Sequence, residues 1–236
     1  MRLSDFLSIT IVGAEYPINL GYTARLMKNF GVEKLYLVKP RVDMRVASVY
    51  ATQGAGVLES AEVVTLAKVR KTHDFLLGTT AIRAKRGANI GRTTIMPEEA
   101  VTRLMNAKSA SMVFGRDTTG LNNEELAMCD LVTNIDTRTE FKTLNVSHSV
   151  AILLYLVSRA ESKPPAEDTA SRERREAFSR YAYQLATATG MQEHKAMRIV
   201  QVARRVATKS EVNSKELGFL ISLMRKAEIT IKDEES

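Results

Sequence analysis

The first 160 residues alternate between short apolar runs and stretches with apolar residues at helical spacing. Each apolar run stops at a glycine, a proline or a small polar turn, as a buried strand does when it enters a loop. The predicted strands are residues 7–12, 35–38, 75–78, 112–114 and 131–135. Strands and helices that alternate in this way predict an α/β fold with a mostly parallel sheet covered on both faces.

Helices are expected between these strands. Asn19 is placed to cap a helix whose apolar stripe includes Leu20 and Ala24, and Gly31 is expected to end it. Residues 47–58 also have helical spacing, and Pro97 stands at the first position of another amphipathic helix.

The longest apolar run, within residues 141–160, follows directly on a small polar turn. Its apolar residues cover most of a helix's circumference, which predicts a helix buried between other layers. The start of this helix carries Thr143, Asn145, Ser147 and Ser149, so backbone N–H groups and small side chains converge where a polar ligand could bind. Ordinary helix capping by Thr143 or Asn145 is the simpler interpretation of the same residues.

The C-terminal part of the chain differs in composition. Residues 161–171 contain two prolines, small residues and acids, which predicts a linker between a domain of residues 1–160 and an extension of residues 172–236. Helices are predicted at residues 172–187, 192–208 and 214–228. Residues 172–232 contain 13 basic and 6 acidic residues, and Arg198 and Arg205 lie on one face of the middle helix. Such a face could bind RNA backbone or simply be exposed to solvent; charge density favours RNA.

Charge and cysteine content indicate the kind of partner and the redox compartment of the protein. Thirty-four lysines and arginines against 27 aspartates and glutamates give a net charge of +7, which favours a polyanionic partner such as nucleic acid. The single cysteine, Cys129, excludes an internal disulfide and a cysteine-rich zinc site, and favours a reducing, cytoplasmic setting. No apolar run approaches the roughly 18 residues of a membrane span. We therefore expect no membrane anchor, no targeting segment and no metal.

Three polar turns follow predicted strands, at residues 79–81, 114–120 and 135–145. In open parallel sheets ligands bind beyond the carboxyl ends of the strands, so these turns form a candidate site. The segment GAGVLE at residues 54–59 lacks the third glycine of the dinucleotide fingerprint, and no GxxxxGK[ST] sequence occurs.

A glycine-containing loop after the turn at residues 79–81 carries the basic residues Arg83, Lys85, Arg86 and Arg92. This loop could contact phosphates as a lid or be an ordinary solvated loop.

Three segments resemble the motifs of the TrmH-like SPOUT methyltransferases. They are NLGYTAR at residues 19–25, VFGRDTTGLNNEEL at residues 113–126 and TLNVSHSVAI at residues 143–152. Their order and spacing, with the basic helical tail, resemble the TrmJ branch, tRNA 2′-O-methyltransferases that act at nucleotide 32 of the anticodon loop. Asp117 departs from the pattern, because relatives commonly carry glutamate there. The acidic group is kept with a shorter reach.

The resemblance implies a fold and a cofactor. The α/β domain is expected to contain a deep C-terminal trefoil knot, to bind S-adenosylmethionine and to pair as a homodimer that acts on tRNA, at cytidine, with uridine as a second candidate base. Family positions imply a cofactor pocket made by Thr79, Thr80, Ala81, Gly115, Ile135, Thr143, Leu144 and Asn145.

The resemblance also places Arg25 beside the reacting 2′-hydroxyl. A guanidinium with a pKa above about 12 is a poor general base, so we expect Arg25 to clamp the adjacent phosphate and stabilise the forming alkoxide. Asn19 is expected to orient Arg25, while Arg116 and Asn145 polarise the site. His148 is expected in core packing or a dimer contact.

Three other functions stay open from the sequence. A non-catalytic RNA-binding protein would explain the charge but not three polar turns at strand ends, and a small-molecule methyltransferase would explain the turns but not the basic tail. A 2′-O-methyltransferase acting on rRNA is the third alternative.

Overall fold

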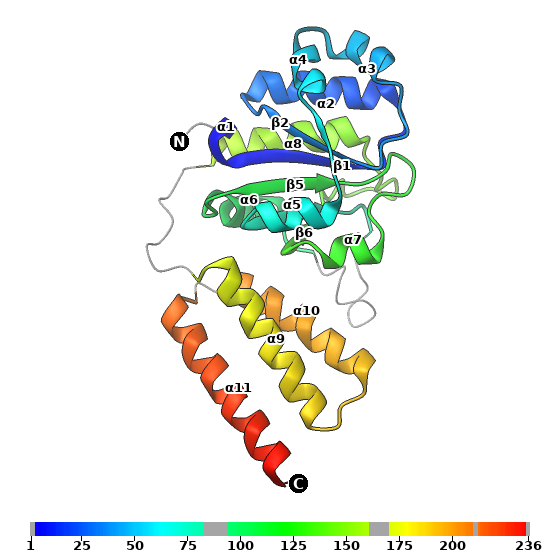
Figure 1. Cartoon of the computed structure of the whole chain (residues 1–236). Helices are drawn as coiled ribbons and strands as arrows, with labels where there is room; N and C mark the ends of the chain where they lie inside the picture. Colours follow the sequence, from blue (N-terminus) through cyan, green and yellow to red (C-terminus); the bar gives the residue numbers. More distant parts are fainter. Residues whose placement is uncertain (1–2, 83–93, 161–169, 210–211, 235–236) are drawn as a thin grey trace. The chain divides into compact units, whose positions relative to one another are not determined.

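The computed structural model describes residues 3–82, 94–160, 170–209 and 212–234 (Figure 1). The chain divides into two compact units, Met1–Lys163 and Pro164–Ser236, each described here by itself. The predicted linker at residues 161–171 lies mostly outside the described residues, so the predicted division into residues 1–160, 161–171 and 172–236 stays a prediction.

The first unit is built on a six-stranded sheet in which every neighbouring pair of strands is parallel. The strand order is β3-β2-β1-β5-β4-β6. The strands are β1 Leu7–Val12, β2 Lys34–Val38, β3 Glu62–Val63, β4 Phe75–Thr79, β5 Ala110–Phe114 and β6 Leu131–Thr133. This confirms the predicted α/β fold with a mostly parallel sheet. The short edge strand β3 was missed because both of its residues are exposed and give no apolar run.

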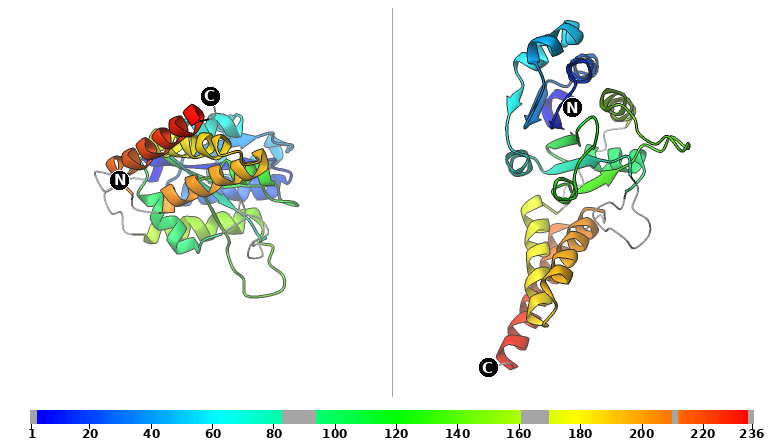
Figure 2. Two further views of the ribbon diagram at one scale, coloured as in Figure 1. Left: turned by 90° about the horizontal axis from the view of Figure 1, so that it is seen from below. Right: turned by 90° about the vertical axis from the view of Figure 1, so that its right-hand side faces the viewer.

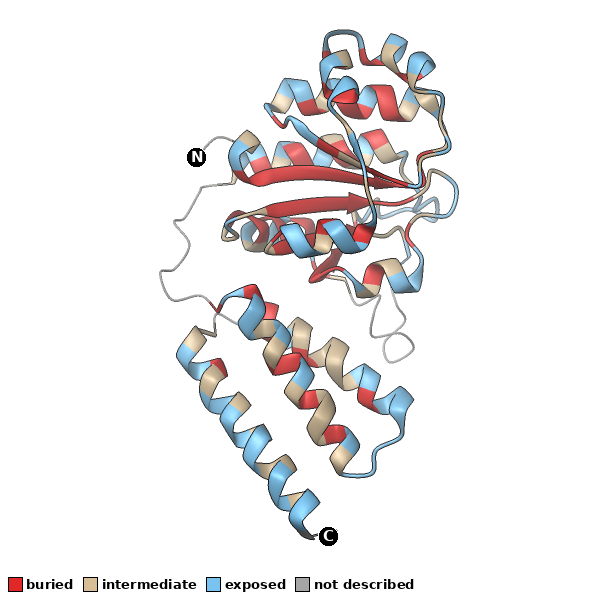
Figure 3. Cartoon of the chain, in the orientation of Figure 1, coloured by how far each residue is buried: buried red, intermediate tan, exposed pale blue. Residues whose placement is uncertain are grey.

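Helices cover both faces of this sheet. They are α1 Leu3–Phe6, α2 Pro17–Phe30, α3 Met44–Ala51, α4 Ala55–Glu59, α5 Leu66–Thr72, α6 Pro97–Met105, α7 Asn123–Ala127 and α8 Val146–Arg159, with a 3-10 turn η1 at Thr52–Gly54. Buried residues of α2, α6 and α8 form one apolar core with Leu7, Ile9 and Ile11 of β1. A smaller core on Val12, Val113 and Val132 includes residues of α5 and α7. The central strands β1 and β5 are buried at every position (Figure 3).

Two helix boundaries differ from the sequence prediction. Helix α2 begins at Pro17 with Tyr16 as its N-cap, so Asn19 lies inside the first turn and does not cap it; Gly31 ends the helix with φ 69°, as predicted. The single helix expected at residues 47–58 is interrupted at Thr52, which has φ 50°. The reason is tertiary: a Cβ on Gly54 would lie 2.7 Å from backbone atoms of Ala24, so this turn packs directly on α2.

The second unit consists of α9 Arg172–Ala188, α10 Glu193–Lys209 and α11 Ser214–Glu234, which match the three predicted helices. Helix α9 packs against both α10 and α11. A capping box begins α11, because Asn213 N donates to Glu216 Oε2 at 2.8 Å and Glu216 N donates to Asn213 Oδ1 at 2.9 Å.

Two further expectations concern a knot in the first unit and membrane-spanning helices. The deep trefoil knot implied by the resemblance stays a prediction. In the described part of the chain, no helix is long and apolar enough to cross a membrane.

Candidate functional site

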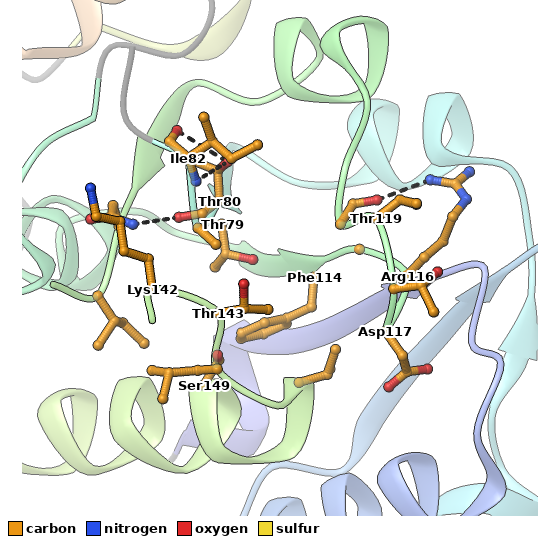
Figure 4. A pocket seen from close by; sticks show the side chains of 18 of the residues that line it. Thr79, Thr80, Ile82, Phe114, Arg116, Asp117, Thr119, Lys142, Thr143 and Ser149 are labelled. Carbon is orange, nitrogen blue, oxygen red and sulfur yellow. Dashed lines mark hydrogen bonds between the residues drawn. The ribbon is translucent and has the colours of Figure 1, made fainter. Parts of the chain in front are cut away.

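A pocket lies at the carboxyl ends of β4, β5 and β6 (Figure 4). Thr79, Phe114 and Thr133, the last residues of these three strands, line it. Because parallel strands present their carboxyl ends at one edge of the sheet, the turns that follow them meet there. The start of α8 closes the pocket with Val146 and Ser149.

The pocket brings together seven of the eight residues predicted to bind a cofactor. These are Thr79, Thr80, Ala81, Gly115, Ile135, Thr143 and Leu144. Asn145 is not among the lining residues, although both of its neighbours are. The prediction missed Asn134 and Lys142, which also line the pocket. The only signal for Asn134 in the sequence is its place directly after an apolar strand.

Hydrogen bonds fix the turn that follows β4. The Asn134 side chain donates from Nδ2 to the Thr80 carbonyl at 2.8 Å, and Thr80 N donates to the Thr133 carbonyl at 3.1 Å. Thr79 Oγ1 donates to the Val113 carbonyl at 3.1 Å. These bonds link β4, β5 and β6, so this wall of the pocket is held before any ligand binds.

A chain of side-chain hydrogen bonds joins the three motif segments. Asn19 Nδ2 donates to Asp117 Oδ1, and Asn145 Nδ2 donates to Asn19 Oδ1 at 2.7 Å. Asn145 Oδ1 in turn accepts from Ser147 N at 2.9 Å and from Ser147 Oγ at 2.7 Å. We call Asp117, Asn19, Asn145 and Ser147 the relay. It ties the start of α2, the loop after β5 and the start of α8 into one arrangement.

Asp117 is the fixed end of the relay. Its Oδ2 accepts from Glu15 N at 3.1 Å and from Tyr16 N at 3.3 Å, next to the start of α2. A carboxylate at this end of a helix is favoured by the unpaired N–H groups and the helix dipole. The shorter aspartate therefore reaches the backbone and the Asn19 side chain in place of the glutamate common in relatives.

Asn145 combines the two interpretations offered for its turn. It is the N-cap of α8, because its side chain accepts from Ser147 N. Its amide nitrogen, which capping does not use, points to Asn19. Capping and site assembly therefore use opposite ends of one amide group.

Arg116 is held by an ion pair. Its Nη1 and Nη2 donate to the two carboxylate oxygens of Glu125 at 2.9 and 2.8 Å, and Nη1 also donates to the Gly120 carbonyl at 3.2 Å. The hydrogen bond to Glu125 raises the pKa of Arg116. Burial alone would raise the pKa of Glu125, but hydrogen bonds from Arg116 and from Asn122 N, with the charge of Arg116, hold that pKa below its ordinary value.

This ion pair gives Arg116 a structural role. Because the pKa of Glu125 is lowered, the pair's stabilising contribution is present at neutral pH and is lost as the pH falls through that lowered pKa. Glu125 also closes the capping box of α7 with Asn122. Arg116 therefore shapes the pocket loop, and the predicted polarising role stays a prediction.

Arg25 lies on α2 with an exposed side chain. It makes no hydrogen bond or ion pair with another described residue, and it does not line the pocket. The expectation that Asn19 orients Arg25 is therefore corrected: the Asn19 side chain bonds to Asp117 and Asn145. A free guanidinium in this position is available to an external anion.

The predicted RNA contacts divide into three groups. Arg83, Lys85, Arg86 and Arg92 lie outside the described residues. Arg198 is exposed on α10. Arg205 is only half-exposed and its Nη1 atom is buried, so it is a poorer phosphate contact than predicted.

His148 corrects a further expectation. It is exposed at the start of α8, so it does not pack in the core. A dimer contact remains the predicted role for this side chain.

Gly115 shows why the pocket loop needs glycine. A Cβ at this position would collide with backbone atoms of Gly120 and Leu121, because the loop folds back on itself. Gly115→Ala should destabilise the protein by about 1–3 kcal/mol, seen as a lower Tm in thermal unfolding followed by circular dichroism. Gly56→Ala is the control, since no atom lies within 4 Å of its added Cβ and alanine favours a helix. An unchanged Tm for Gly115→Ala would contradict this account of the loop.

Comparison with known proteins places the chain among RNA methyltransferases. Residues 7–155 match the model of the SpoU rRNA Methylase family. The tRNA (cytidine-2′-O-)-methyltransferase TrmJ of Sulfolobus acidocaldarius is 28% identical over 233 residues, which cover 98% of this chain and 97% of the relative. The tRNA (cytidine/uridine/adenosine-2′-O-)-methyltransferase TrmJ of Pseudomonas aeruginosa is 34% identical over 66% of this chain and 62% of its own length.

The fold has a solved counterpart. The crystal structure of TrmJ from Z. mobilis ZM4 aligns with a TM-score of 0.69 and 25% identity. The alignment covers 94% of this chain and 99% of that chain, so the similarity extends over both units.

Proposed function

The chain belongs to the SpoU rRNA methylase family, and we propose that it methylates the 2′-hydroxyl of a ribose in the tRNA anticodon loop, at nucleotide 32, with S-adenosylmethionine as methyl donor. The observation that carries the proposal is the relay, because it assembles three separate segments beside a pocket at the strand ends. The tRNA methyltransferase names of relatives that match nearly the whole chain support tRNA as the substrate.

The lining of the pocket fits the proposed cofactor. Phe114, Ile135 and Leu144 offer apolar contacts for an adenine ring, and the hydroxyls of Thr79, Thr80 and Thr143 offer polar contacts for the ribose and the amino-acid part. We expect Lys142, which also lines the pocket, to face the carboxylate. When bound, S-adenosylmethionine supplies an electrophilic methyl group on a sulfonium.

The residues of the chain must then place the hydroxyl and stabilise its developing charge. Positioning alone can contribute about 7 kcal/mol or more. Arg25 is proposed to hold the phosphate next to the target ribose and to stabilise the forming alkoxide, with the proton leaving to a phosphate oxygen or to water. Asn145, fixed by Asn19 and Ser147, is proposed to polarise the site from the start of α8.

The experiment that tests this function is mass spectrometry of nucleosides. Purified protein is incubated with isotope-labelled S-adenosylmethionine and either tRNA or rRNA, in EDTA because we expect no metal requirement. Label in 2′-O-methylcytidine from tRNA is expected. Label only in rRNA supports the rRNA alternative, and no label with tight tRNA binding supports a non-catalytic RNA-binding protein.

The range of nucleobases needs its own comparison. The name of the S. acidocaldarius relative specifies cytidine, whereas that of the P. aeruginosa relative adds uridine and adenosine. We propose cytidine as the main substrate, because the S. acidocaldarius relative matches the longer part of this chain. Transcripts with each of the three bases at nucleotide 32 separate the two patterns.

We also propose that the protein is a homodimer. Ile18 and Tyr22 on α2 and Ile152 and Tyr155 on α8 are 37–57% exposed, and these two helices pack side by side. Exposed apolar side chains on two adjacent helices are typical of a protein interface. Tyr155→Arg should shift the protein from dimer to monomer in light scattering, while the exposed Val63→Arg should not. A monomeric wild type with full activity would exclude the homodimer.

The basic helices of the second unit are proposed to contact tRNA. Removing residues 164–236 should leave S-adenosylmethionine affinity nearly unchanged, because every residue that lines the pocket lies in the first unit. The tRNA affinity should fall roughly tenfold or more and depend less steeply on salt, since phosphate contacts release counterions. Fluorescence anisotropy across a salt series measures both. Equal affinity and equal salt dependence would assign these helices no role in tRNA binding.

A further inference from the structure

Phe141 is the most exposed large apolar side chain in the described part of the protein, at 81%. It lies in the segment between β6 and α8, which extends away from the sheet (Figure 2). Single exposed apolar residues are common and need no explanation by themselves. The surroundings of Phe141 make it different.

Hydrogen bonds from other residues of the same loop hold the backbone of Phe141. Thr137 Oγ1 and Thr139 Oγ1 both donate to the Phe141 carbonyl, at 3.2 and 3.0 Å. Arg138 turns the chain with φ 55°, and its N–H donates to Asp136 Oδ1 at 3.1 Å. The loop therefore fixes the backbone at Phe141 and leaves its side chain exposed.

Phe141 is also next to the pocket in the chain. Lys142 and Thr143, the two residues that follow, both line the pocket. Consecutive Cα atoms are about 3.8 Å apart, so the Phe141 backbone stands within about two residue lengths of the pocket lining. Phe141 is therefore close in the chain to residues proposed to hold the cofactor.

We propose that Phe141 stacks on an unpaired base of the RNA substrate beside the methylated ribose and so positions that ribose. This inference rests on the proposed function. Bases in single-stranded loops are commonly recognised by stacking on aromatic side chains. The net charge of +7 favours a polyanion over another protein as the partner that covers this ring.

The kinetic test replaces Phe141 in the full-length protein. Stacking on one base is worth about 1–3 kcal/mol, so Phe141→Ala should raise KM for tRNA by about 5- to 150-fold. The kcat should change less, and S-adenosylmethionine affinity from calorimetry should stay the same, because the pocket is intact. Phe141→Tyr should retain near wild-type KM, since its ring can also stack. Val63→Ala, an exposed apolar residue on β3 that does not line the pocket, is the control.

A direct readout separates stacking from other roles. A tRNA with 2-aminopurine beside the target nucleotide should lose fluorescence on binding to wild type and to Phe141→Tyr, and less on binding to Phe141→Ala. Equal KM and equal quenching for Phe141→Ala would overturn the inference. Dissociation of a dimer by Phe141→Ala would overturn it too, because a second copy of the chain would then cover the ring. If wild type methylates no tRNA, the proposed function itself fails, a result distinct from either of these.

Discussion

Replacing Asn145 by alanine is expected to lower turnover by about 100-fold or more, the usual cost of removing one positioned donor near a reacting oxygen. The variant loses the bond from Asn145 Nδ2 to Asn19 and both bonds from Ser147 to Asn145 Oδ1. Loss of the helix cap should cost only about 1 kcal/mol of stability, so the chain should stay folded. Single-turnover methylation and thermal unfolding measure the two effects separately.

Asn145→Asp separates capping from the relay. Aspartate is an equally good N-cap, but it cannot donate to Asn19 Oδ1 as the amide does. This variant should unfold at nearly the wild-type temperature and still lose most of its turnover. Asp43→Ala provides the matched control, because it removes the N-cap of α3, which accepts from Arg45 N and Val46 N. Near-normal turnover in Asn145→Ala would contradict this prediction and would mean that Asn145 only caps the helix.

Arg25→Ala is expected to reduce turnover by about 100- to 1,000-fold, with a smaller effect on S-adenosylmethionine affinity. Arg25 is exposed, and no described residue holds its guanidinium by a hydrogen bond or ion pair. Arg25→Lys should retain more activity than Arg25→Ala, because it keeps the charge but loses the two-pronged geometry suited to phosphate. Lys28→Ala, an exposed basic residue further along the same helix, is the control.

The pH dependence of Arg25→Lys decides whether this side chain takes the proton. If the residue only clamps phosphate, the variant should show no new ionisation below about pH 9, since the reference pKa of lysine is near 10.4. Rate measurements between pH 6 and about pH 9 test this, because a lysine with its reference pKa stays protonated over that interval. Activity that rises along a single titration of the new lysine would instead identify this position as the general base.

Much of the fold could be predicted because its signals are local. Apolar runs such as residues 7–12 and 75–78 are buried strands, and the stripes of the tail are the helices α9, α10 and α11. The exceptions are contacts that no short window contains. Thr52 interrupts a helix because Gly54 packs on α2, a contact between segments about 30 residues apart in the sequence.

The position of the candidate site could be predicted from the sequence, but the hydrogen bonds and ion pairs within it could not. Three polar turns after apolar strands were enough to locate the pocket, because parallel strands bring their carboxyl ends together. The sequence did not predict which residue each polar side chain of the site contacts. Arg116 was expected to polarise the site, which stays a prediction, and its ion pair with Glu125 was not predicted from the sequence.

The sequence by itself determined five of the six strands, the basic helical tail and the resemblance carried by three segments, because apolar periodicity and turn residues act over a few positions. Only the tertiary structure decided that Asn19 bonds to Asp117 and Asn145, which are 98 and 126 residues away along the chain. A hydrogen bond depends on distance and direction in space, and side chains so far apart in the sequence meet only after the sheet has brought its loops to one edge.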